Sequence, residues 1–61
     1  MLLEKIITRK LLMISIKLVE KNGNWGNASK EEFLNVIKQA SEKKYLNDKE
    51  VFDLTKRAMA I

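Results

Sequence analysis

The fold of this chain is decided by residues 2–21, LLEKIITRKLLMISIKLVEK. The stretch contains no glycine or proline, and it is followed by Asn22-Gly23, where glycine can adopt the left-handed conformation that closes a helix. Its apolar residues recur at the spacing of one helical face. They are Leu3, Ile7, Leu11, Ile14 and Leu18. The stretch therefore predicts a helix of about five to six turns.

A second apolar sector lies off this regular face of the helix. An amphipathic surface helix has one apolar face and an opposite polar face. We expect the rest of the chain to cover the regular face and to leave the second sector uncovered. Burying four such side chains is worth about 1.5–3 kcal/mol each, which is comparable to the stability of a whole domain. We therefore predict a partner-binding surface formed by Leu2, Ile6, Leu12, Met13, Ile16 and Val19, together with Trp25 in the following loop.

Residues 13–18 allow a second interpretation. In this segment Ile14, Ile16 and Leu18 alternate with polar residues, which is the pattern of a half-buried strand. The helical spacing extends over more residues than this alternation does. We therefore favour the helix and keep the strand as an alternative for the assembled state.

Two shorter helices are predicted in the second half of the chain. Residues 30–43 and 48–60 each have one clean apolar face. Each starts with a capping box, formed by Ser29 and Glu32 in the first and by Asn47 and Glu50 in the second. The short link between the two segments makes them a helical hairpin or a helix-turn-helix corner.

The predicted architecture is a single all-α domain spanning residues 1–61. It consists of a long apolar and basic helix at 1–21, a Gly/Asn loop at 22–29 and a helical hairpin at 30–61, with the long helix packed on the hairpin. A chain of this size buries only about 60% of its unfolded surface, so a single core leaves it marginally stable. Small folds add a disulfide, a metal or a second subunit. The chain has no Cys and no His, so we expect a dimer.

The sequence contains few side chains that are suited to catalysis. Without Cys or His there is no thiol nucleophile and no imidazole base. The paired acids Glu31/Glu32 and Asp48/Glu50 fall in the first turns of helices, where they favour the positive end of the macrodipole. The loop at 22–29 contains neither a phosphate-binding glycine motif nor the acidic cluster that a cation would need. We expect no enzyme activity, no metal and no cofactor.

The positive charge is concentrated at the N-terminal end. The net charge is +4, and residues 1–21 carry five basic and two acidic side chains, whereas the remainder is nearly balanced. These basic residues are interleaved with the apolar ones rather than opposite them, which disfavours binding to a membrane surface. The apolar run at 11–19 is broken by Lys17 and is shorter than the roughly 20 residues that cross a bilayer. No cleavage site follows it, so we expect a cytoplasmic protein.

Nucleic-acid binding is the alternative function. Residues 48–60 would take the recognition position of a helix-turn-helix, with Lys49, Lys56 and Arg57 available for phosphates. Asp48 at the start of that segment would instead repel the phosphate backbone. If residues 13–18 were a strand, the order strand, helix, helix would be similar to that of ribbon-helix-helix repressors, in element order only and with no shared motif.

These observations lead to one functional expectation. We expect a small non-enzymatic protein-protein interaction module, a regulator or inhibitor that binds a partner protein, itself, or both through the N-terminal helix. The regulatory role is inferred from the small size and the lack of catalytic groups.

Overall fold

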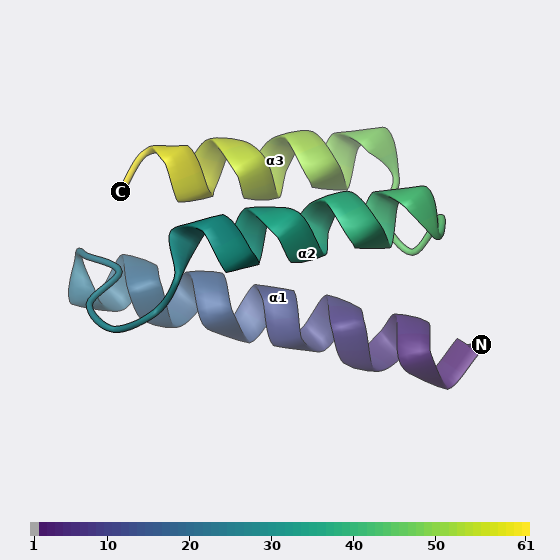
Figure 1. The fold of residues 1–61 in the computed structure, drawn as a ribbon, viewed down its shortest axis with the longest axis horizontal. Coiled ribbons are helices and arrows are strands. Elements are labelled where there is room, and N and C mark those ends of the chain that lie inside the picture. The colour runs from purple at the N-terminus through teal and green to yellow at the C-terminus, as the bar shows by residue number, and fades with distance from the viewer. Residues whose placement is uncertain (1) are drawn as a thin grey trace.

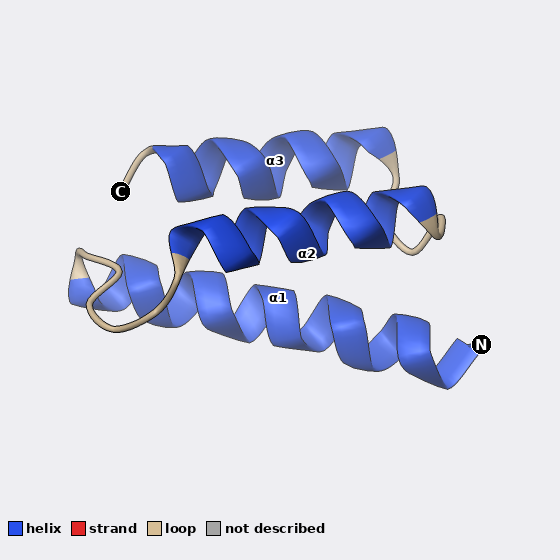
Figure 2. Cartoon of the chain, viewed as in Figure 1, coloured by secondary structure: helices blue, strands red, loops and turns tan. Residues whose placement is uncertain are grey.

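The computed structural model describes residues 2–61 and contains three helices, α1 (Leu2–Asn22), α2 (Lys30–Glu42) and α3 (Asp48–Met59). The chain turns back on itself after each of the first two helices, so α1 and α3 run in the same direction and α2 runs against both (Figure 1). The described residues contain no strand, and residues 13–18 lie within α1 (Figure 2). The predicted all-helical architecture is confirmed, and the helix ends agree with the prediction to within one residue.

Side-chain caps fix the starts of the second and third helices. The hydroxyl of Ser29 accepts a hydrogen bond from the backbone N–H of Glu32 at 3.1 Å. Asn47 and Glu50 form a complete capping box, in which each side chain accepts a hydrogen bond from the other residue's backbone N–H, at 2.8 and 3.1 Å. Because the first N–H groups of a helix have no partner within the helix, these local bonds determine where α2 and α3 begin.

The first two helices end at residues with a positive φ angle. Gly23 follows α1 with a φ of 78°, as its sequence position predicts, whereas the corresponding residue after α2 is Lys44 with a φ of 64°. The Lys44 N–H donates to the carbonyl of Ser41 at 3.0 Å, and the Tyr45 N–H donates to the carbonyl of Ala40 at 2.8 Å. These two bonds define a Schellman motif, whose left-handed position is usually glycine.

Replacing Lys44 with glycine is expected to raise the free energy of unfolding by about 1 kcal/mol, because the left-handed conformation strains a residue that carries a Cβ atom. Urea denaturation monitored by circular dichroism measures the change. Lys44→Ala is the control, since it removes the charge and keeps the Cβ atom. If Lys44→Ala stabilised the chain as much as Lys44→Gly, the effect would come from the charge and not from the backbone.

The core lies where the three helices meet. It is formed by Leu12, Ile16 and Val19 of α1, by Phe33, Ile37 and Ala40 of α2, by Leu46 in the second connection, and by Leu54 and Ala58 of α3. α2 and α3 contact each other more extensively than either contacts α1. The hairpin is therefore the better-packed unit, and α1 is added to it along one face.

The orientation of α1 is the reverse of the predicted one. Leu12, Ile16 and Val19 belong to the sector that was expected to remain uncovered, yet their exposed fractions are 3%, 0% and 5%. The regular face that was expected to pack on the hairpin points to solvent instead. Leu12, Ile16 and Val19 are themselves spaced by four and three residues, so both sectors of α1 satisfy the helical period. Periodicity shows that a face is apolar, but it does not show which of two apolar faces the hairpin covers.

In this orientation, ion pairs between α1 and the hairpin lie on both flanks of the buried sector. Lys43, just after α2, pairs with Glu4 at 3.1 Å, and Glu50 of α3 pairs with Arg9. At the other end of the helix, the Arg57 guanidinium donates two hydrogen bonds to the carboxylate of Glu20, at 3.0 and 2.5 Å. These contacts join segments that are far apart in the sequence, so no local pattern reveals them.

Candidate interaction surface

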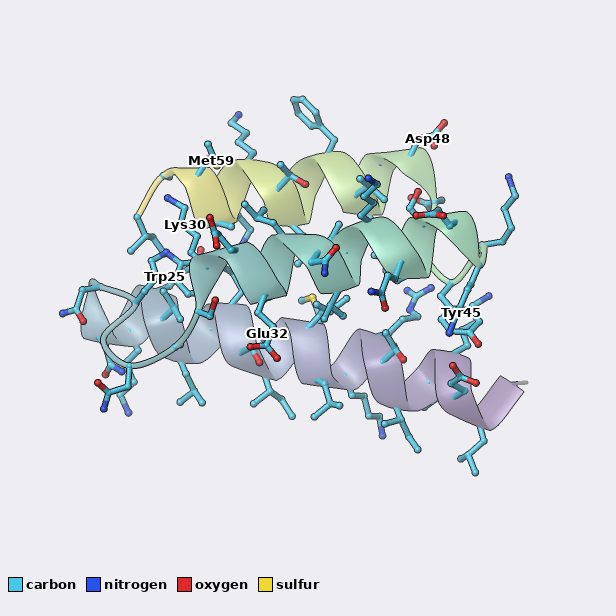
Figure 3. All side chains as sticks on the ribbon, in the orientation of Figure 1. Trp25, Lys30, Glu32, Tyr45, Asp48 and Met59 are labelled. Carbon is cyan, nitrogen blue, oxygen red and sulfur yellow. The ribbon has the colours of Figure 1, made fainter. Side chains whose placement is uncertain are left out.

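The side chains that α1 turns away from the hairpin form a continuous apolar strip, which we call the α1 stripe. Its members and their exposed fractions are Leu3 67%, Ile7 48%, Leu11 58%, Ile14 56% and Leu18 55%. Residues three and four apart are neighbours on a helix, so these five side chains adjoin along the helix. Figure 3 shows hydrocarbon side chains leaving α1 on the side opposite to α2. The five exposed fractions add up to nearly three complete side chains. Burying that apolar surface against a partner would stabilise the complex by about 4–8 kcal/mol.

Charged side chains surround the α1 stripe in a defined order. At 100° per residue, exposed Lys10 and Lys17 lie along one edge of the stripe. Ile6 and Met13, with exposed fractions of 43% and 39%, lie beyond these lysines. Lys21 follows the stripe in the last turn of α1, and exposed Glu4 precedes Ile7 by three residues in the first turn. The face is thus apolar along its axis, with unlike charges at its two ends.

The residues predicted to bind a partner are divided between surface and core. Ile6 and Met13 are exposed, whereas the other described α1 members of the set, Leu12, Ile16 and Val19, are buried within the chain's own core. The side chain of Leu2, the first residue of α1, lies outside the described part of the structure. The α1 stripe is not among the residues predicted to bind a partner, because its regular spacing predicts packing on the hairpin.

Trp25 closes one end of the core. Its ring lies 5.4 Å from the ring of Phe33, with the two planes tilted by 57°, and the residue packs against the core cluster while remaining partly exposed. The indole Nε1 is buried, and within residues 2–61 no hydrogen-bond acceptor reaches it. Trp25 therefore packs mainly within the chain, and its exposed part borders a groove between α1 and α2.

This groove continues the α1 stripe toward α2. It has a volume of about 470 Å³, within the usual range for ligand pockets. Its apolar lining includes Leu11, Leu18 and Val19 of α1, Trp25 of the loop, and Phe33 and Val36 of α2. Leu11 and Leu18 belong to both the groove and the stripe, so the two form one continuous surface. Glu32 is the only charged residue among those that line the groove.

Not all of the side chains that were candidates for binding phosphate are free to do so. Arg57 is held by the two hydrogen bonds to Glu20, and a second carboxylate, that of Asp53, lies 3.6 Å from its guanidinium. The hydrogen bonds that Arg57 donates to Glu20 raise the pKa of Arg57; desolvation opposes this effect, and the charges of Glu20 and Asp53 add to it. Lys49 and Lys56 remain exposed on α3. In Figure 1, α2 and α3 run antiparallel and side by side, unlike the angled helices of a helix-turn-helix.

The Glu20–Arg57 pair predicts a loss of stability in acid. The hydrogen bond from Arg57 lowers the pKa of Glu20; desolvation opposes this effect in part, and the charges of Arg57 and Lys17 add to it. A carboxyl whose pKa is lower in the folded chain stabilises the fold above its unfolded pKa of about 4.3. This contribution is lost as the pH falls through the folded pKa. Lys43 lowers the pKa of Glu4 in the same direction, chiefly through its hydrogen bond.

We therefore expect the melting temperature to fall between neutral pH and about pH 3, and to fall less in Glu20→Gln than in the native chain. At neutral pH, Glu20→Gln is expected to be the less stable of the two. Thermal melts followed by circular dichroism at both pH values measure the difference. Equal acid-induced shifts in the two proteins would contradict a stabilising role for this pair.

No cluster of three or more carboxylates that could hold a metal ion is present among the described residues. Within that same part of the chain, no helix is both long and apolar enough to cross a membrane. No family model, no curated protein and no solved structure is significantly similar to the chain. The surface is therefore interpreted from its own residues.

Proposed function

We propose that this chain is a small non-enzymatic interaction module that binds protein through the α1 stripe. The observation that supports this proposal is the exposure of five adjoining large apolar side chains on one helix face. Single exposed apolar residues are common on monomeric proteins, but a contiguous patch marks an interaction surface. Because the surface carries no group suited to catalysis, such a module acts by occupancy, as a regulator or inhibitor of the protein that it binds.

A protein surface fits the stripe better than a membrane does. An interfacial helix places its apolar residues on one side and its lysines on the other, with the apolar side immersed in the bilayer. Here Lys10 and Lys17 lie between the stripe and the apolar side chains of Ile6 and Met13. Immersing the whole exposed face would carry both lysines into the lipid. A partner helix lying along the stripe leaves them at its rim, in water.

Photo-crosslinking in the cells that produce the protein tests this proposal. A benzophenone side chain in place of Ile14 lies on the stripe, and the same group in place of Lys38 lies on the exposed surface of α2. We expect protein adducts from position 14 that are absent from position 38. Adducts of a second copy and adducts of another protein both support a protein-binding stripe. Equal adduct patterns at the two positions, or none at position 14, would overturn the proposal.

Binding to duplex DNA is the alternative to the proposed function, and it is tested separately. Phosphate contacts by lysine make the affinity fall steeply with salt, because each contact releases a counterion. If the chain bound DNA tightly, if salt weakened this binding steeply, and if Lys49→Ala combined with Lys56→Ala abolished it, nucleic-acid binding would replace the proposed function. We expect only weak DNA binding that these two substitutions change little.

A further inference from the structure

We propose that the α1 stripe is covered by the α1 stripe of a second copy of this chain, with the two helices antiparallel. In the pairing that we infer, Ile7 of each copy faces the partner's Leu18, and Leu11 faces the partner's Ile14. This inference rests on the proposed function, because it identifies the partner of the same surface. It goes further by fixing the orientation and the register of the two helices.

From Ile7 to Leu18, the spacing of the stripe is that of a coiled-coil seam, and Leu3 lies one residue outside this series. Ile7, Leu11, Ile14 and Leu18 are separated by four, three and four residues, which are the alternating steps of the a and d positions of a heptad. This series is the same when read from either end. Two copies can therefore be paired antiparallel about a two-fold axis without a change of register. Each contact layer then contains one isoleucine and one leucine, so the layers have equal volume.

The charges at the ends of the seam favour the antiparallel arrangement. Glu4 lies three residues before Ile7, and Lys21 lies three residues after Leu18, so both continue the same series. Antiparallel helices place Glu4 of each copy opposite the partner's Lys21. Parallel helices would place Glu4 against Glu4 and Lys21 against Lys21, and such like-charge contacts select against a pairing.

Glu4 remains available for this contact in the folded chain. Its Oε1 atom accepts from Lys43 at 3.1 Å, and its side chain remains 52% exposed. A carboxylate has two oxygen atoms and several acceptor sites, so it can accept from a second lysine. The α1 face away from the hairpin is also unobstructed, because α2 and α3 both lie on the other side of the helix (Figure 1).

The arrangement on the rim agrees with a polar border around an apolar seam. Lys10 and Lys17 lie on one edge of the stripe, so the antiparallel pair brings Lys10 near the partner's Lys17 there. Both are exposed to solvent, where salt screens their repulsion. Thr8 and Ser15 border the other edge, and they add no charge to it.

Disulfide crosslinking tests the orientation, because the native chain contains no cysteine. We use two single variants, Ile7→Cys and Leu18→Cys. In the antiparallel pair these positions face one another, whereas two copies of either position are offset by about 16 Å along the helix. A disulfide requires Cα atoms within about 7 Å. We therefore expect a covalent dimer from an oxidised mixture of the two variants and little from either variant alone. Phe52→Cys, on the exposed surface of α3, is the control for random collision.

Two results of this experiment would overturn the proposal. Efficient crosslinking of each variant with itself, above the level of Phe52→Cys, would show parallel helices. A native chain that keeps the mass of one copy by light scattering at high micromolar concentration would show that no second copy binds. In that case photo-crosslinking at position 14 decides separately whether the proposed function stands, since adducts of another protein would preserve it.

Charge exchange tests the register independently of cysteine chemistry. Lys21→Glu and Glu4→Lys are each expected to weaken the dimer about tenfold, because each turns two attractive contacts into repulsive ones. The double variant with both changes is expected to recover the native dimer affinity. The recovery is specific to the interface, because the double variant still lacks the Glu4–Lys43 pair. Lys38→Glu is the matched control and is expected to leave the affinity unchanged. Single variants that dimerise as well as the native chain, or a double variant that fails to recover, would overturn the inferred register.

Discussion

Replacing Ile16 with alanine is expected to lower the free energy of unfolding by about 2–5 kcal/mol. Ile16 is fully buried, with 0% of its surface exposed, where α1 meets the hairpin. Alanine would lose the transfer free energy of the removed methyl and methylene groups and would leave a cavity. A small domain has a total stability of only about 5–15 kcal/mol, and a chain of this size lies near the lower limit. The variant should therefore be largely unfolded at moderate urea concentrations.

Ile14→Ala is the matched control, because it makes the same substitution two residues earlier on the same helix. Ile14 is 56% exposed, so its truncation should change the stability of a single copy by less than about 1 kcal/mol. Urea denaturation of both variants at low protein concentration separates folding from association. If Ile14→Ala were the more damaging change under those conditions, α1 would be rotated relative to the structure described above.

Replacing Ile14 with lysine is expected to weaken self-association by about 30- to 150-fold. The exposed part of Ile14 accounts for about 1–1.5 kcal/mol on burial, and the two-fold pair contains this residue twice. The fold of each copy should persist, because Ile14 contributes to the surface and not to the core. Sedimentation equilibrium over a dilution series measures the dissociation constant, and circular dichroism checks the helical content.

Phe52→Lys is the control for this second prediction. Phe52 is 69% exposed on α3, so the substitution removes an apolar side chain that is even more accessible than Ile14 from a different face. We expect it to leave the dissociation constant unchanged. If Phe52→Lys dissociated the dimer and Ile14→Lys did not, the interface would lie on α3.

One face of α1 packs on the hairpin, and another face forms the exposed α1 stripe. Among the α1 side chains that the structure describes, the buried ones all lie between positions 12 and 19, and the preceding turns form the Glu4–Lys43 and Arg9–Glu50 pairs with the hairpin. Exposed ion pairs contribute little stability. A second copy packed along the stripe would bury apolar side chains at both ends of α1. Association is therefore expected to stabilise the half of the helix that the hairpin supports least.

Local sequence signals account for the secondary structure of this protein. The three helices, their limits and the two capped helix starts follow from bonds between residues close in the chain, such as those between Asn47 and Glu50. Gly23 ends α1 for the same reason, since its conformation depends on its lack of a Cβ atom. Lys44 shows the limit of this kind of signal. A lysine occupies the position that glycine usually takes, and only the surrounding backbone bonds hold it there.

The buried face of α1, in contrast, follows from the packing of this helix against the hairpin. Both apolar sectors of the helix satisfy the same period, so local pattern could not distinguish the core residue Ile16 from the surface residue Ile14. The choice depends on contacts between distant segments, including the pairing of Arg57 with Glu20, 37 residues away in the sequence. Because Arg57 is held by this contact, its guanidinium is not free to bind phosphate. The location of the proposed interaction surface thus depends on how α1 packs on the hairpin, because an apolar face is open to a partner only when the chain's own core leaves it uncovered.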